Sequence, residues 1–163
     1  MLFRSARAKL FAGCEPGSGI WPREVAKFGA IGVLERISTG EYKNFDRILA
    51  TDGELVLRTC ESIGVEFLTP ESQNWPESLS DLVSPPIALT AKGDTALLNE
   101  KSLAIVGSRN PTNYGLRIAS DFAAGFVDRG WTVISGGAYG IDAAAHKGAL
   151  IAEGSTIAVL AAG

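Results

Sequence analysis

The segment Ser102–Gly163 decides the fold of this 163-residue chain, because it repeats one pattern of apolar run and glycine turn. Leu103–Val106 (LAIV) precedes the turn Gly107–Arg109 (GSR), and Trp131–Ile134 (WTVI) precedes the turn Ser135–Gly140 (SGGAYG). Short continuous apolar runs are typical of strands buried on both faces of a sheet. The two turns therefore follow two strands, at the edge where parallel sheets bind phosphates and other anions.

Helix-like stretches separate these strands. After an opening within Pro111–Asn113, apolar residues recur three and four apart over Leu116–Val127. A second helix is expected from about Ile141 to just before Gly154, and Thr156–Leu160 is a third apolar run. This alternation of strand and helix predicts an α/β fold, a parallel Rossmann-like sheet with right-handed crossovers.

The rest of the chain suggests a second, smaller domain. Residues 1–60 show helical spacing broken at glycine-containing sites, and we expect a helical N-terminal domain that serves as a cap or as an interaction module. Gly64–Thr69 and Ile87–Ala91 predict short strands, so residues 61–163 are assigned to the Rossmann-like domain. The chain stops at Ala161–Gly163, where the next ligand-facing loop would begin. We therefore expect the sheet to be incomplete at its C-terminal end and the chain to be a fragment.

Composition excludes several classes of protein. The net charge is −3, and residues 101–163 hold 5 Lys/Arg and 4 Asp/Glu, so a nucleic-acid site would have to be local. Cys14 and Cys60 are the only cysteines, which argues against a disulfide framework, a zinc site or any other metal site. Without a signal peptide or a membrane-length apolar run, we expect a soluble, cytoplasmic protein that needs no cofactor.

The two turns lack the fingerprints of the common nucleotide sites, Gly-x-Gly-x-x-Gly and the ATP-binding P-loop. Arg109 nevertheless offers a planar fork of donors for a phosphate, and Ser108 offers a hydroxyl. Glycines let a phosphate approach the main chain closely, although each alone could simply make a tight turn. The predicted phosphate-binding residues are Gly107, Ser108, Arg109, Ser135, Gly136, Gly137 and Gly140.

Four further residues near the turns are accessory candidates. Tyr114 and Tyr139 could stack on bases or pack against the loops, and Lys147 could reach a phosphate or stay solvated. His146 follows Asp142 by four residues, but no nucleophile or metal cluster accompanies the pair. We therefore favour a supporting role for His146 and assign no catalytic residue.

Together these blocks resemble the DNA-processing protein A family, also called DprA or Smf. The resemblance rests on Ala104–Arg109 (AIVGSR), Tyr114-Gly115, Ser135–His146 (SGGAYGIDAAAH) and Thr156–Leu160 (TIAVL), in this order and spacing. It covers Ser102–Gly163 well, and the segment around Phe67–Pro70 and Trp75-Pro76 resembles the family's lead-in to the sheet. One departure is Tyr139, where many members have Arg, so a pocket cation is either absent or replaced by a stacking ring.

The resemblance implies a non-catalytic protein that binds single-stranded DNA in a pocket lined by the two glycine turns. It also implies protection of incoming DNA, loading of the RecA recombinase in natural transformation or recombination, and a homodimer in the full-length protein. An alternative is a nucleotide-binding or nucleotide-hydrolysing enzyme of a related Rossmann-like family. The Pro-Gly-Gly-x-Gly-Thr motif of one such family, which acts on nucleoside monophosphates, is absent from the sequence.

Overall fold

The computed structural model describes residues 2–15 and 19–160. The chain forms two compact units, Met1–Thr95 and Ala96–Gly163, which are described separately below. Residues 16–18, within one of the expected glycine-containing breaks, and the chain end at Ala161–Gly163 lie outside the described residues. No helix in the described part of the chain is long and apolar enough to cross a bilayer.

The first unit contains four helices, and its larger apolar core lies between α1, α2 and α3. The buried side chains of this core include Leu10, Trp21, Val33 and Ile48. α2 is broken at Gly29, whose backbone (φ 69°, ψ 163°) is not helical. The helices are α1 Leu2–Gly13, α2 Ile20–Ser38, α3 Asp46–Ala50 and α4 Gly53–Ser62.

A two-stranded antiparallel ribbon, β1 Glu66–Leu68 with β2 Leu89–Ala91, belongs to the same unit. Phe67 packs edge-on against Phe11 of α1, with ring centroids 5.5 Å apart. Arg4 Nη2 donates a hydrogen bond to the Phe67 carbonyl at 2.8 Å. These contacts tie the ribbon to the helices, so the two units divide after Thr95, whereas the sequence placed a domain boundary near residue 60. Short 3₁₀ turns cover Glu77–Asp81 (η1) and Thr95–Asn99 (η2).

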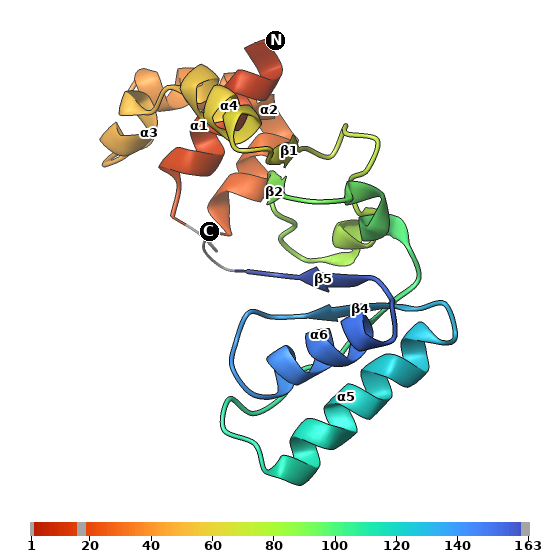
Figure 1. Cartoon of the computed structure of the whole chain (residues 1–163). Coiled ribbons are helices and arrows are strands. Elements are labelled where there is room, and N and C mark those ends of the chain that lie inside the picture. Colours follow the sequence, from red (N-terminus) through yellow and green to blue (C-terminus); the bar gives the residue numbers. More distant parts are fainter. Residues whose placement is uncertain (1, 16–18, 161–163) are drawn as a thin grey trace. The chain divides into compact units, whose positions relative to one another are not determined.

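The second unit contains the predicted parallel sheet. Its strands are β3 Ser102–Ala104, β4 Thr132–Ser135 and β5 Thr156–Ala158, in the spatial order β3-β4-β5. Both crossover helices, α5 Asn113–Val127 and α6 Ile141–Ile151, lie on one side of the sheet (Figure 1). The mixed fold expected from the sequence, with a parallel sheet after a small helical part, is confirmed.

Small side chains let the two helices approach the sheet closely. Ala123 of α5 and Ala145 and Ala149 of α6 are fully buried against Val133 of β4. α5 opens at Thr112, whose hydroxyl accepts a hydrogen bond from the Gly115 N–H at 3.2 Å, as expected for an N-cap. This packing holds the starts of α5 and α6 next to the ends of β3 and β4.

Candidate functional site

The two glycine turns lie against each other through their main chains. The Ile141 N–H, at the start of α6, donates a hydrogen bond to the Ser108 carbonyl at 3.1 Å. Gly140, the N-cap of α6, has a φ of 88°, and a Cβ there would overlap the Ser108 carbonyl oxygen. Since only glycine accepts both the dihedral angle and the contact, the structure requires Gly140 where the first turn meets the second.

Gly107 makes the same junction from the other side. A Cβ at this position would lie 2.7 Å from Cγ1 of Ile141. A larger residue would therefore require Ile141, at the start of α6, to move. The sequence predicted that both turns face one edge of the sheet, and the structure brings them together there.

Side chains of α6 hold the second turn. The Asp142 carboxylate accepts a hydrogen bond from the Ala138 N–H at 3.3 Å, and His146 Nε2 lies 2.9 Å from the Gly136 carbonyl oxygen. A carbonyl can only accept, so His146 Nε2 carries the hydrogen. Asp142 and His146 thus both bind the turn, one helical turn apart, and stabilise its shape.

His146 also links the turn to the neighbouring strand. Its Nδ1 lies 2.7 Å from the Thr156 hydroxyl of β5, and that hydroxyl lies 2.9 Å from the Val133 carbonyl of β4. The supporting role favoured for His146 is consistent with this position. This role of Thr156 could not be predicted from the sequence, because the contact depends on the register of β5.

Ser135 differs from the other predicted phosphate-binding residues. Its side chain is buried, with the residue 2% exposed, and its hydroxyl donates to the Ile105 carbonyl at 2.6 Å. This bond joins the end of β4 to the residue that directly follows β3. The structure therefore gives the Ser135 hydroxyl an internal partner rather than a place on the surface.

Several main-chain hydrogen-bond donors of the two turns belong to exposed residues. Ser108, Arg109 and Gly137 are exposed, and none of the described residues accepts a hydrogen bond from their backbone N–H groups. The Ser108 hydroxyl accepts from the Asn110 N–H at 3.1 Å, which shapes the first turn. Free main-chain donors beside the N-terminus of α6 form an environment that favours an anion.

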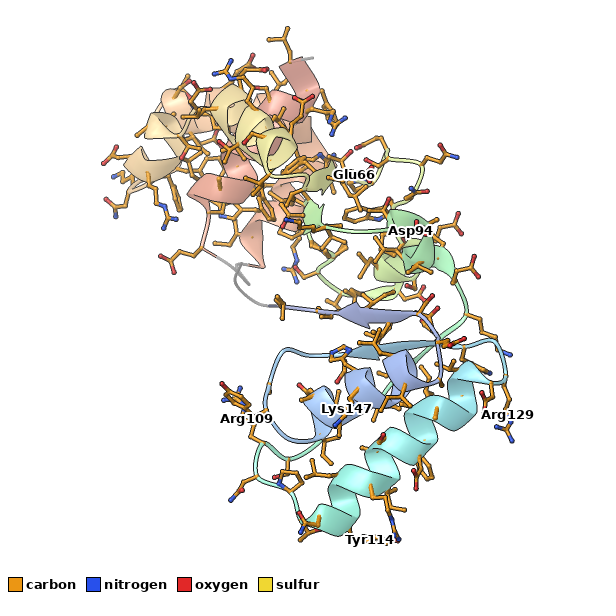
Figure 2. The ribbon with its side chains drawn as sticks, in the orientation of Figure 1. Glu66, Asp94, Arg109, Tyr114, Arg129 and Lys147 are labelled. Atoms are coloured by element: carbon orange, nitrogen blue, oxygen red, sulfur yellow. The ribbon has the colours of Figure 1, made fainter. Side chains whose placement is uncertain are left out.

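The two turns and the helices that follow them also carry exposed charged and aromatic side chains. Arg109 extends from the first turn into solvent, and Lys147 projects from α6 (Figure 2). Tyr139, at the tip of the second turn, is 88% exposed, and Tyr114, at the start of α5, is 67% exposed. Both rings are thus accessible for stacking. Asp142 adds one negative charge in the first turn of α6, so Arg109 must outweigh it when a phosphate binds.

No group of three His, Cys, Asp or Glu side chains within residues 2–15 and 19–160 is arranged to hold a metal ion. The exposed donors of the two turns are main-chain amides and the guanidinium of Arg109. Such donors can bind and orient phosphate groups.

The fold is a parallel α/β domain in which two glycine turns meet at the ends of neighbouring strands. The model of the DNA recombination-mediator protein A family matches residues 66–163, and the chain belongs to this family. This match confirms the family predicted from the four sequence blocks.

Known relatives agree with this assignment. A Mycobacterium tuberculosis (strain ATCC 25618 / H37Rv) relative that carries the name DNA processing protein DprA is 40% identical over 148 residues. These residues cover 83% of this chain and 37% of the relative, so the chain spans well under half of that protein.

Two solved structures are similar. DNA processing protein A from Streptococcus pneumoniae matches 96% of this chain and 55% of its own, with a TM-score of 0.70 and 24% identity, which supports the fold. DNA processing protein A from Helicobacter pylori, a structure concerned with single-stranded DNA binding, matches 58% of this chain and 42% of its own. Its TM-score is 0.50 and its identity 32%.

Proposed function

We propose that this chain is a DNA-contacting part of a recombination mediator, and that it binds single-stranded DNA at the edge formed by the two glycine turns. The observation that carries the proposal is the junction of these turns, where Gly140 lies on the Ser108 carbonyl. That junction places the free N–H groups of Ser108, Arg109 and Gly137 at one edge. The Helicobacter pylori relative, described for its single-stranded DNA binding mode, supports the ligand class.

Each group at the edge has a distinct task in this proposal. Main-chain N–H groups donate to phosphate oxygens, and Arg109 neutralises a phosphate through two parallel hydrogen bonds. Tyr139 and Tyr114 stack on bases, which every base allows because each has a π-face. Lys147 adds attraction at longer range. The expected binding has little sequence preference and a strong dependence on salt.

For the full-length protein we propose the wider role that its family name indicates. The protein would protect single-stranded DNA in the cytoplasm and help to load the RecA recombinase during natural transformation or recombination. It would act as a homodimer and without catalysing a reaction. The family model and the DprA name of the relative support a recombination role.

Fluorescence anisotropy of a labelled oligonucleotide across a salt series tests the DNA site. Arg109→Ala should weaken binding about tenfold and lower the salt slope by about 0.7, the value for one contact to a single strand. The matched control is Arg129→Ala, which removes the same charge at the other end of α5 (Figure 2). If both variants lose affinity equally, only net charge matters and the site assignment is wrong.

The non-catalytic part of the proposal has its own test. The protein is incubated with single-stranded DNA and with nucleoside monophosphates, and the products are separated by chromatography. We expect both substrates to remain intact. Release of free base or of shortened DNA would establish an enzyme and support the alternative function.

A further inference from the structure

A groove of about 420 Å³ lies within the first unit. Phe3 and Arg7 of α1, the part of α2 around Gly29, and the segments Pro70-Glu71 and Pro85–Ile87 line it. Among the described residues that line it, only Arg7 and Glu71 have polar side chains. Proline offers no N–H group and has a restricted backbone, so much of the wall is rigid and without donors. The groove therefore combines an apolar surface with one charged pair.

Arg7 is the buried member of this pair. Its side chain is only 7% exposed. Nη1 donates to the Ile87 carbonyl at 2.9 Å, and Nη2 donates to Oε1 of Glu71 at the same distance. The Phe3 ring centroid lies 4.8 Å from the guanidinium carbon. Burial lowers the pKa of the Arg7 guanidinium, and the Glu71 carboxylate partly offsets this shift.

One donor of Arg7 is unused. The Nε–H is buried and has no hydrogen-bond partner among the described residues. Leaving a buried donor unpaired costs free energy, and native structures rarely do so without a reason. Nε and Nη2 form one edge of the guanidinium, the edge that a carboxylate usually binds with both oxygens. Only Nη2 of that edge is engaged, by a single oxygen of Glu71.

We propose that this groove binds the carboxylate of a small amphipathic acid on the Nε–Nη2 edge of Arg7. The apolar body of the acid lies against the proline-rich wall. The volume falls within the range of about 300–1,000 Å³ that is usual for small-molecule sites. Sugars and nucleotides do not fit this chemistry, because the lining side chains offer no further partners for their hydroxyl groups or for a second negative charge.

In this proposal Glu71 competes with the ligand carboxylate for Arg7. Arg7 Nη2 already donates a hydrogen bond to a Glu71 carboxylate oxygen at 2.9 Å, so this side of the guanidinium can bind a carboxylate. The Glu71 side chain is 55% exposed, so it can turn into water at little cost when a ligand carboxylate takes its place. Removing the charge of Glu71 should therefore strengthen ligand binding.

The test is an NMR titration of the full chain with 3-phenylpropanoate, using 3-phenylpropanamide as the uncharged probe. The acid at millimolar concentration should shift the amide signals of Ala26, Gly29 and Ile87, and the amide probe should leave them unchanged. Glu71→Gln should raise the affinity for the acid about threefold, the scale of one partly exposed ion pair. Glu61→Gln on α4 removes the same charge outside the groove and should leave the affinity as it is.

Three outcomes overturn the proposal. The first is the absence of shifts at millimolar acid. The second is an equal response to the acid and the amide, which would indicate apolar contact alone. The third is an unchanged or weaker affinity in Glu71→Gln, which would mean that Glu71 does not compete for Arg7. None of these variants removes Arg7 itself, whose hydrogen bond to Ile87 contributes to the fold.

Discussion

The two glycine turns occupy the same edge of one sheet, but they are built differently. The second turn is held by side chains: Asp142 binds Ala138, and His146 binds Gly136. The first turn has its main chain packed on α6 and presents Arg109 to solvent. The second turn thus contributes a fixed shape to the site, and the first turn contributes the positive charge of Arg109.

This difference predicts that residues that hold the turns affect stability, whereas exposed residues of the turns affect DNA binding. Changes in the residues that hold the turns should lower the free energy of unfolding. Arg109→Ala should change DNA binding with almost no effect on stability, since exposed side chains rarely contribute more than about 0.5 kcal/mol.

The largest effect is expected for Gly140→Ala. A Cβ would meet the Ser108 carbonyl while the residue keeps a φ of 88°, so we expect a loss of about 3 kcal/mol in the free energy of unfolding. Urea unfolding followed by circular dichroism measures this loss. The control is Gly130→Ala, where φ is 74° but a Cβ meets no atom within 4 Å, and where strain alone should cost about 1 kcal/mol. Equal losses would show that the turns do not depend on their contact.

A smaller effect is expected for His146→Phe, which keeps a ring but removes both of its hydrogen bonds. The Gly136 carbonyl loses its partner, and the expected loss is about 2 kcal/mol. Hydrogen exchange should also become faster at the Ala138 amide, because the second turn loosens. Lys147→Met, the exposed neighbour, serves as the control. Unchanged exchange at Ala138 would mean that Asp142 alone holds the turn.

Ser135→Ala tests whether the Ser135 hydroxyl stabilises the fold or binds a phosphate. Loss of the bond to the Ile105 carbonyl should cost about 1 kcal/mol, while affinity for single-stranded DNA should stay within about twofold. Anisotropy and urea unfolding on the same protein give both values. A large loss of DNA affinity at full stability would restore Ser135 to the phosphate site and contradict the position of its hydroxyl in the structure.

The sequence predicted the parts of the fold that follow from local pattern. The apolar runs at Leu103–Val106 and Trp131–Ile134 predicted neighbouring strands, and the structure pairs them in parallel. Parallel pairing forces the following turns to one edge, so the meeting of the turns could be inferred without coordinates. The family followed from the order of the same blocks.

Contacts between distant segments could not be predicted in this way. The position of the Ser135 hydroxyl depends on the twist and pairing at the end of β4, and the partner of His146 depends on the register of β5. The break of α2 at Gly29 was also not predicted, because the apolar spacing continues on both sides of it. The groove around Arg7 combines segments more than 60 residues apart, a distance over which periodicity carries no information.

The smallest effect on stability is expected for Asp142→Asn. This variant tests whether the negative charge of Asp142 weakens DNA binding beside Arg109. The Asn side-chain oxygen can still accept from the Ala138 N–H, so the loss should be about 0.5 kcal/mol. The negative charge at the phosphate edge disappears, and affinity for DNA should rise about twofold at low salt. High salt should remove this gain, because salt already screens the repulsion between Asp142 and phosphate in the unsubstituted protein. A lower affinity at full stability would show instead that Asp142 positions the donors of the second turn through its charge.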